Sequence, residues 1–294
     1  MSSHPMLGLI GAGTMGSGMA KNLIKAGFAL SVFDLKIENV NALVQAGATA
    51  GSSTLDVIQK SDVTLTSLPT SGTFVKVAEE IIPHLTPNKI IIDTGTTEVP
   101  ETKRLAQLIR QKGADLVDAP VSGGGRGAET GTLAIMVGGA DEAVQRCMPI
   151  LNVIGDNIGH LGNIGAGQLG KAINQIAMGV GLAAFAEALY LGVQAGIDPQ
   201  KIWDTLSTAG AAKTSFQNAA RQVIEGRIEA QDFKLRELPY FIAQAKNQNI
   251  NLPLTEALYN FASRGKNRTT DPLGIPTPSF WYELNNRSRE DSET

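Results

Sequence analysis

The sequence predicts an α/β domain built on a doubly wound, mostly parallel sheet, followed by an all-α domain. Two observations lead to this prediction. In the first half, short apolar runs that suit buried strands alternate with segments whose apolar residues recur at helical spacing. In the second half, residues 168–196 contain no proline and almost no charge, which predicts one long apolar helix, buried on all sides. We place the two domains at residues 1–163 and 164–294.

The composition is that of a soluble globular protein with room for two domains. The chain has 294 residues, of which 43% are hydrophobic and 18% are charged. Its net charge of −3 argues against nucleic acid or a membrane surface as a partner. A single cysteine excludes an internal disulfide framework, and three scattered histidines predict no metal site. The N-terminal residues lack the basic stretch of a signal peptide, so we expect a cytoplasmic location.

The first predicted strand, residues 7–10, runs directly into a glycine-rich turn and then a helix. The turn consists of Gly11, Ala12, Gly13, Thr14, Met15 and Gly16. This is the G-x-G-x-x-G pattern in the strand, turn and helix context that it requires. Its glycines allow the tight turn, the approach of a pyrophosphate to the backbone and the close packing of helix on strand. The unit therefore predicts a Rossmann-like domain in which these six residues bind a dinucleotide.

Asp34 follows the second predicted strand, residues 28–33, and lies 18 residues beyond Gly16. A carboxylate at this place can accept hydrogen bonds from both ribose hydroxyls of NAD, and it repels the 2′-phosphate of NADP. The alternative is an aspartate that caps the following helix. The spacing favours ribose binding, so we predict NAD as the cofactor and NADP as the less suitable one.

Two more strand and helix units follow. The strands are predicted at residues 62–68 and 89–93, and the helices at residues 74–85 and 99–112. Near-continuous apolar strands of this kind are buried on both faces of a parallel sheet. The loops after them lie at the carboxyl edge, where such a sheet binds its ligand. Leu68, Pro69 and Thr96 are therefore candidate cofactor-binding residues, although loops rich in Thr and Pro are also ordinary turns.

A strand at residues 116–121 leads into a loop rich in serine and glycine at residues 122–131. Such a loop can present backbone N–H groups and a hydroxyl to a small anion. Ser122, Gly123 and Gly124 are its candidate anion-binding residues. Taken alone, the run also fits a flexible surface loop.

Lys171 lies near the start of the long helix, just after a second glycine-rich turn. Asn174 and Gln175 share its helix face, because they follow it at i+3 and i+4. Burial would bring the pKa of the ammonium down toward neutrality and make the amine a usable proton donor and acceptor. The alternative is a lysine that extends from the helix end into solvent. We favour a core helix over a membrane span, because polar and glycine residues interrupt the apolar run.

Three stretches, in this order and spacing, resemble the cofactor, substrate and catalytic signatures of the β-hydroxyacid dehydrogenases. They read GLIGAGTMGSGMAKNLIKAG, DAPVSGGGRGAETG and GNIGAGQLGKAINQ. That family includes 3-hydroxyisobutyrate dehydrogenase and is related to 6-phosphogluconate dehydrogenase. The resemblance implies that Lys171 is the general acid and base and that Asn174 assists. It also implies that the substrate carboxylate is held by Ser122, Gly123 and Gly124.

The sequence departs from the family pattern at three places. Gln175 is one methylene longer than the usual asparagine, and Gly95 stands where a serine is common. The family's second active-site lysine is replaced by Arg236 or by Tyr240, depending on the end from which the segment is counted. A guanidinium binds carboxylates differently from an ammonium. We keep Gln175 and Arg236 as candidate substrate-binding residues, and we expect a helix to begin at Pro239.

We therefore expect an NAD-dependent 3-hydroxyacid dehydrogenase that acts on a small hydroxy acid or semialdehyde as a homodimer or homotetramer. The alternatives are an imine or other semialdehyde reductase on the same scaffold, and a non-catalytic cofactor-binding module. From about residue 262 the chain is a tail rich in proline and charge, without the family's usual ending. Its aromatic cluster, Phe280, Trp281 and Tyr282, either docks on a neighbouring subunit or belongs to a loosely packed extension.

Overall fold

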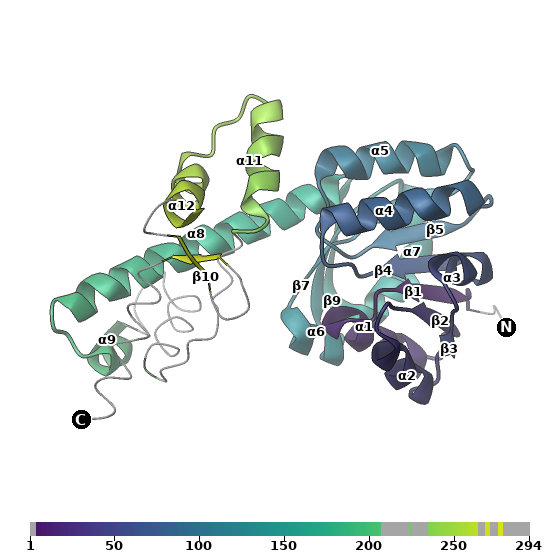
Figure 1. The fold of residues 1–294 in the computed structure, drawn as a ribbon, viewed down its shortest axis with the longest axis horizontal. Coiled ribbons are helices and arrows are strands. Elements are labelled where there is room, and N and C mark those ends of the chain that lie inside the picture. Colours follow the sequence, from purple (N-terminus) through teal and green to yellow (C-terminus); the bar gives the residue numbers. More distant parts are fainter. Residues whose placement is uncertain (1–3, 207–223, 225–234, 264–267, 271–275, 279–294) are drawn as a thin grey trace. The chain divides into compact units, whose positions relative to one another are not determined.

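The protein is described by a computed structural model that covers residues 4–206, 224, 235–263, 268–270 and 276–278 (Figure 1). The chain divides into two compact units, Met1–Lys171 and Ala172–Thr294. Each unit has a hydrophobic core of its own.

The first unit alternates strands and helices along the chain. Its strands are β1 (Leu7–Ile10), β2 (Leu30–Phe33), β3 (Thr49–Ala50), β4 (Val63–Thr66), β5 (Ile90–Asp93), β6 (Asp115–Asp118), β7 (Val121–Ser122), β8 (Leu133–Gly138) and β9 (Gly155–Gly162). Its helices are α1 (Thr14–Lys25), α2 (Ile37–Gln45), α3 (Thr54–Lys60), α4 (Ser71–Ile81), α5 (Val99–Arg110), α6 (Gly124–Thr130) and α7 (Asp141–Ile154). A short 3-10 turn, Ile82–His84, extends α4.

These strands form one nine-stranded sheet in the order β3-β2-β1-β4-β5-β6-β8-β7, with β9 paired to β8. The strands from β3 to β6 are all parallel, in the order typical of doubly wound dinucleotide-binding sheets. Strand β8 runs antiparallel to β6 and β7 and parallel to β9. The predicted Rossmann-like sheet is confirmed.

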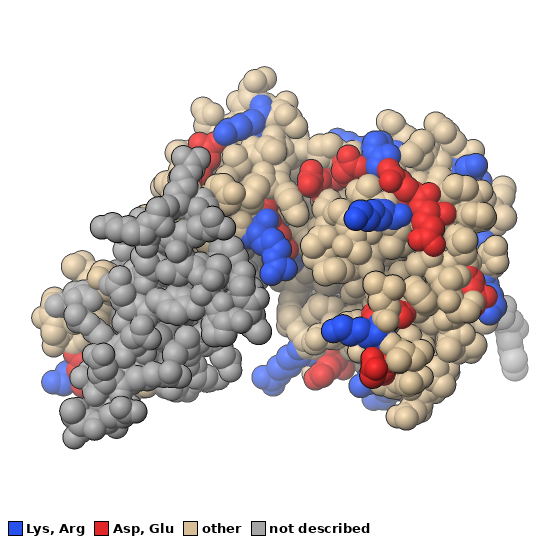
Figure 2. Space-filling model, in the orientation of Figure 1, with Lys and Arg blue, Asp and Glu red and all other residues tan. Residues whose placement is uncertain are grey.

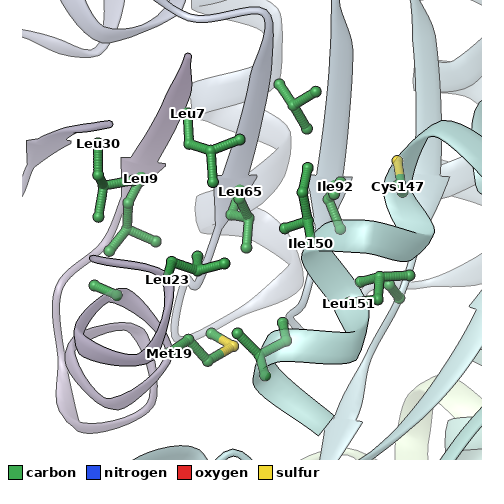
Figure 3. Packing of buried hydrophobic residues seen from close by; sticks show 14 of the residues in the cluster. Leu7, Leu9, Met19, Leu23, Leu30, Leu65, Ile92, Cys147, Ile150 and Leu151 are labelled. Carbon is green, nitrogen blue, oxygen red and sulfur yellow. The ribbon is translucent and has the colours of Figure 1, made fainter. Parts of the chain in front are cut away.

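Helices cover both faces of this sheet. The side chains of its central strands alternate between the two faces, so each of these strands packs against both layers of helices. Ile90 and Ile92 of β5 belong to the cluster that includes α1 and α7, part of which Figure 3 shows around Leu23 and Cys147. Ile91 belongs instead to the cluster that includes α4 and α5. The near-continuous apolar strands read from the sequence are therefore buried on both sides.

The parallel strands all end at one edge of the sheet. This carboxyl edge carries the glycine turn after β1, Asp34 after β2 and Ser67 after β4. Asp93 is the last residue of β5, and Asp118 is the last residue of β6. Polar side chains from four strands are thereby gathered beside the glycine turn of β1, where open α/β sheets bind their ligands.

The second unit is mostly helical, as predicted. Helix α8 (Ala166–Gln194) starts in the first unit, and the second unit adds α9 (Pro199–Leu206), α11 (Leu238–Asn247), α12 (Pro253–Ser263) and the antiparallel pair β10 (Arg268–Thr270) and β11 (Pro276–Pro278). Pro239 lies in the first turn of α11, so the helix start predicted there is confirmed. The aromatic cluster predicted at residues 280–282 lies outside the described residues.

Helix α8 is less buried than its sequence predicts. Ala186 and Leu189 pack in the core of the second unit, whereas Ile173 and Leu191 are exposed. Only 24% of the most apolar window within Ala166–Val193 is buried. The prediction that α8 is buried on all sides is therefore wrong for a single chain. The described helices pack against only one stripe of α8. By length and composition alone α8 could also cross a membrane, a weak criterion that core helices of soluble proteins meet as well.

Charged side chains of both signs are interspersed on the face of the first unit that Figure 2 displays. The chain as a whole has 25 basic and 28 acidic residues. An interspersed surface of this kind does not produce the strong field of one sign that attracts a polyanion.

Candidate active site

A cavity of about 790 Å³ opens at the carboxyl edge of the sheet, beside the ends of β1, β2 and β4. Its volume is typical of small-molecule sites. The predicted cofactor residues that line it are Gly11, Gly13, Thr14, Met15, Asp34, Leu68 and Pro69. Ala12, Gly16 and Thr96 are not among its lining residues. The cavity is also lined by residues that the sequence did not single out, including Lys36, Asn39, Thr54 and Glu80.

The glycine turn has the backbone geometry that a bound pyrophosphate requires. Gly11 has a φ of +96°, and a Cβ there would lie 2.4 Å from the Ser67 carbonyl oxygen. A Cβ at Gly16 would lie 2.0 Å from the Gly11 carbonyl oxygen. At Gly13, the N-cap of α1, nothing lies within 4 Å of the Cβ position. The open space before the helix N-terminus suits an anion, so these residues fit a dinucleotide.

Asp34 is held in place by the main chain. Its Oδ2 accepts a hydrogen bond from the Ala12 N–H at 2.6 Å, and its Oδ1 accepts one from the Lys36 N–H at 2.7 Å. The second contact lies just before α2, whose N-cap is Lys36 and makes no side-chain cap hydrogen bond, so Asp34 does not cap this helix. The first contact fixes Asp34 against the glycine turn, and its side chain belongs to the cavity lining. Binding of the ribose by Asp34 stays a prediction.

The loop predicted at residues 122–131 is wrong over most of its length, because Gly124–Thr130 form helix α6, which packs against α1. We keep the name Ser122 loop for the short connection at residues 122–124 that leads from β7 into α6. Asn22 of α1 donates its amide hydrogen to the Ala128 carbonyl oxygen of α6 at 2.8 Å. A Cβ at Gly125 would lie 2.9 Å from the side-chain methyl of Thr14. The second predicted motif therefore lies directly beside the first.

Gly123 and Gly124 turn the backbone at the start of α6. Their φ values are +136° and +63°, conformations that favour glycine. Both residues are exposed, and nothing lies within 4 Å of a Cβ at Gly124. Ser122 ends β7 just before them. This geometry is that of a turn able to offer N–H groups to a small anion.

Lys171 is buried at the start of α8, with 8% of its surface exposed. Its Nζ donates a hydrogen bond to the Val121 carbonyl oxygen at 2.6 Å. Burying an ammonium is costly without such a partner. The alternative of a lysine that extends into solvent is therefore wrong. Because Val121 precedes Ser122, the amine lies beside the start of the second motif.

The other three predicted substrate residues, Asn174, Gln175 and Arg236, belong to the second unit. Gln175 is buried, and its amide donates a hydrogen bond to the carboxylate of Glu237, the N-cap of α11. Arg236 is exposed, whereas Tyr240 packs against the core of this unit. The roles of the three residues toward a substrate stay predictions.

Two buried carboxylates at the carboxyl edge were not predicted from the sequence. Asp93 and Asp118 are neighbours in register on β5 and β6, and both are fully buried. Asp93 accepts hydrogen bonds from the hydroxyls of Thr97 at 2.6 Å and Thr66 at 3.1 Å. The available signal was an aspartate that ends an otherwise apolar strand, as in IIID and LVD.

Burial determines how these carboxyls titrate. It raises the pKa of Asp93 to about 7 and that of Asp118 to about 6. Hydrogen bonds from Thr97 to Asp93 and from Gly165 to Asp118 oppose this change without cancelling it. The negative charge of Asp118 raises the pKa of Asp93 further.

We expect Asp93→Asn to gain stability relative to the wild type as the pH rises from about 4 to about 7. In this range the folded wild type keeps a proton on Asp93 that the unfolded chain has released, since the ordinary pKa is 3.8. Because the folded state binds more protons than the unfolded chain in this range, the free energy of unfolding of the wild type falls as the pH rises. The amide of the variant does not titrate. The difference in free energy of unfolding between the variant and the wild type should therefore change by a few kcal/mol over this range. Urea unfolding at several pH values measures it, and a difference independent of pH would contradict the assignment.

Matches to known protein families agree with a dinucleotide-binding first unit followed by a helical second unit. Residues 6–162 match the NAD binding domain of 6-phosphogluconate dehydrogenase, and residues 165–273 match the NAD-binding domain of NADP-dependent 3-hydroxyisobutyrate dehydrogenase. The 2-(hydroxymethyl)glutarate dehydrogenase of Eubacterium barkeri is 35% identical over 262 residues, which cover 87% of each chain. An NAD-dependent L-serine dehydrogenase of Pseudomonas aeruginosa is 35% identical over 77% of this chain and 78% of its own length.

Solved structures lead to the same family. The crystal structure of 3-hydroxyisobutyrate dehydrogenase from Salmonella typhimurium is similar with a TM-score of 0.78 and 26% identity. The match covers 87% of this chain and 92% of that one. The first unit also brings the glycine turn, the Ser122 loop and the buried Lys171 close to one another. These features and the matches above show that the chain belongs to the β-hydroxyacid dehydrogenase family and is an NAD-dependent dehydrogenase.

Proposed function

We propose that the protein interconverts a small 3-hydroxy carboxylate and its semialdehyde, with Lys171 as the general acid and base. The observation that carries the proposal is the buried amine, 2.6 Å from the Val121 carbonyl oxygen and beside the Ser122 loop. The relatives support the substrate class, because they act on 2-(hydroxymethyl)glutarate, L-serine and 3-hydroxyisobutyrate. All three acids carry a hydroxymethyl group on the carbon next to a carboxylate and differ in the remaining substituent.

The cofactor would be held by the glycine turn and its flanking loops. Gly13 and the N-terminus of α1 would bind the pyrophosphate, and Asp34 the ribose hydroxyls. Further cofactor contacts are proposed for Gly11, Ala12, Thr14, Met15, Gly16, Leu68, Pro69 and Thr96. Bound NAD supplies the acceptor for the hydride that leaves the hydroxyl-bearing carbon.

The remaining chemistry belongs to the chain itself. In oxidation the neutral amine of Lys171 takes the hydroxyl proton, and in reduction the ammonium returns a proton to the carbonyl oxygen. Backbone N–H groups and the hydroxyl at residues 122–124 orient the carboxylate, which fixes the reacting carbon in place. Further substrate contacts are proposed for Asn174, Gln175 and Arg236.

Steady-state rates with a panel of compounds test this function. The panel contains 3-hydroxyisobutyrate, L-serine, 2-(hydroxymethyl)glutarate, a 2-hydroxy acid such as lactate, and a cyclic imine, each with both nicotinamide cofactors. We expect NAD-dependent turnover of one or more hydroxymethyl acids and none of lactate. Turnover of the imine alone would support the reductase alternative. Tight NADH binding without turnover of any compound would support a non-catalytic module.

We also propose that the protein acts as a homodimer or homotetramer. Ile173, Met178 and Leu191 are exposed along α8, and apolar surface of this kind is typical of subunit interfaces. Size-exclusion chromatography with light scattering should therefore give two or four times the mass of one chain. Leu191→Glu should shift the protein toward smaller species. A monomeric wild type would contradict the proposal.

A further inference from the structure

The start of α8 is bound to the end of β6 by one carboxylate. Asp118 Oδ1 accepts a hydrogen bond from the Gly165 N–H at 2.8 Å, and Oδ2 accepts one from the Gln168 N–H at 2.9 Å. N–H groups at a helix start have no partner within the helix, so an outside acceptor is needed. A negative charge at this end is also favoured by the helix dipole. Asp118 therefore supplies both a cap and a counter-charge to the long helix.

Gln168 ties the same turn of α8 to the loop after β5. Its Oε1 accepts a hydrogen bond from the Thr97 N–H at 3.0 Å, and its Nε2 donates to the Gly95 carbonyl oxygen at 3.0 Å. The Thr97 hydroxyl in turn donates to Asp93. We call Asp93, Thr97, Asp118 and Gln168 the α8 clamp. The clamp joins the helix start to the ends of two adjacent strands.

The packing under the helix start is tight. A Cβ at Gly167 would lie 2.4 Å from the Met136 carbonyl oxygen and 2.5 Å from the Asp118 carbonyl oxygen. The helix backbone is therefore packed closely against β8 and the end of β6. Lys171 follows Gln168 by three residues on this same stretch of helix. A displacement of the first turn would carry the Lys171 amine away from the Val121 carbonyl oxygen.

We propose that Asp118 is a positioning residue for the reaction, which sets the place of the Lys171 amine by holding the start of α8 on the carboxyl edge. The inference rests on the proposed role of Lys171. Thr96, a candidate cofactor contact, lies between the two loop residues that Gln168 binds. The clamp therefore fixes the lysine and a cofactor loop to the same rigid support.

Asp118→Asn tests the proposal with almost no change of shape. An amide nitrogen cannot accept a hydrogen bond, so one of the two backbone N–H groups would face another donor. We expect kcat to fall about a hundredfold, the scale of a misplaced catalytic group, while the Kd of NADH changes by less than about threefold. Asp115→Asn is the matched control, because Asp115 begins the same strand and pairs with Arg110 on the surface. It should leave kcat near the wild-type value.

A pH profile distinguishes positioning from a general loss of structure. In the reductive direction Lys171 must carry a proton. Loss of this proton lowers the rate at high pH, and it does not produce a fall in rate at low pH. Within the clamp Asp118 faces the second carboxyl group, Asp93 on β5, and the charged groups beside the clamp are Lys103 on α5, next to Gly165, and Lys171 on α8. Burial raises the pKa of Asp118 to about 6. Asp93, with a pKa of about 7, titrates in both proteins, so we expect the wild-type kcat to show an additional fall near pH 6 that is absent in Asp118→Asn.

Gln168→Met provides a second variant should Asp118→Asn fail to fold. It keeps the side-chain length, removes the side-chain hydrogen bonds to Thr97, Gly95 and Asp93, and should lower kcat at least about tenfold. A wild-type kcat and the same additional fall near pH 6 in Asp118→Asn would overturn the proposal. So would a parallel loss of NADH binding and kcat in both variants, which would make the clamp a general folding element. If Lys171→Ala keeps its turnover, the proposed function fails instead, and the two failures are therefore distinguishable.

Discussion

Replacing Lys171 by alanine is expected to lower kcat by at least about a hundredfold, the scale of a general acid and base. The amine is the candidate proton donor and acceptor that the first unit buries, and its hydrogen bond to Val121 places it beside the Ser122 loop. The cavity with the glycine turn is formed by other residues. The Kd of NADH, measured by fluorescence titration, should therefore stay close to the wild-type value.

Lys89→Met is the matched control for this variant. The Lys89 ammonium also donates hydrogen bonds to carbonyl oxygens, those of Ile58 and Ser61 at the end of α3. Lys89 precedes β5 and so lies at the opposite edge of the sheet from the candidate site. We expect its replacement to lower the free energy of unfolding by roughly 1–3 kcal/mol and to leave kcat unchanged. A Lys171→Ala enzyme with near wild-type turnover would refute the role of Lys171.

Asp34 is expected to make the protein prefer NADH over NADPH by on the order of a hundredfold or more. A 2′-phosphate next to this carboxylate would bring like charges within a few Å, which costs roughly 4 kcal/mol per pair of unit charges near a protein surface. Two main-chain N–H groups hold Asp34, so it cannot simply turn away. Asp34→Asn should reduce the preference at least about tenfold, mainly through tighter NADPH binding.

Glu38→Gln controls for the change of net charge alone. Glu38 is exposed in the first turn of α2 and does not line the cavity. Fluorescence titration of both reduced cofactors should show almost the wild-type preference in this variant. Tighter NADPH binding by the wild type would show that Asp34 serves only to hold the main chain at Ala12 and Lys36.

The parts of the fold that the sequence predicted are those with local signals. Gly11, Gly13 and Gly16 predict the turn after β1, and the apolar runs around residues 63–66 and 90–93 predict buried strands. Local patterns also placed the long helix and the proline that starts α11. In each case the information lies within a few neighbouring residues, because backbone conformation and burial are read from spacing and composition.

The parts that were missed depend on contacts between distant segments. Asp118 and Gln168 are 50 residues apart, and nothing near either residue indicates that they meet. The fully buried Asp93 was likewise visible only as the last residue of an apolar strand. Hydropathy also could not show that one stripe of α8 is covered within the chain while Ile173 and Leu191 stay exposed. Tertiary pairing and assembly determine these features, and local sequence does not encode them.

A single-turnover measurement tests the role of Lys171 most directly. Enzyme in excess over a hydroxymethyl acid, with saturating NAD, reports the formation of NADH without product release. We predict that Lys171→Ala slows this step at least about a hundredfold, whereas Lys89→Met matches the wild type. Formation of NADH at the wild-type rate by Lys171→Ala would contradict the account.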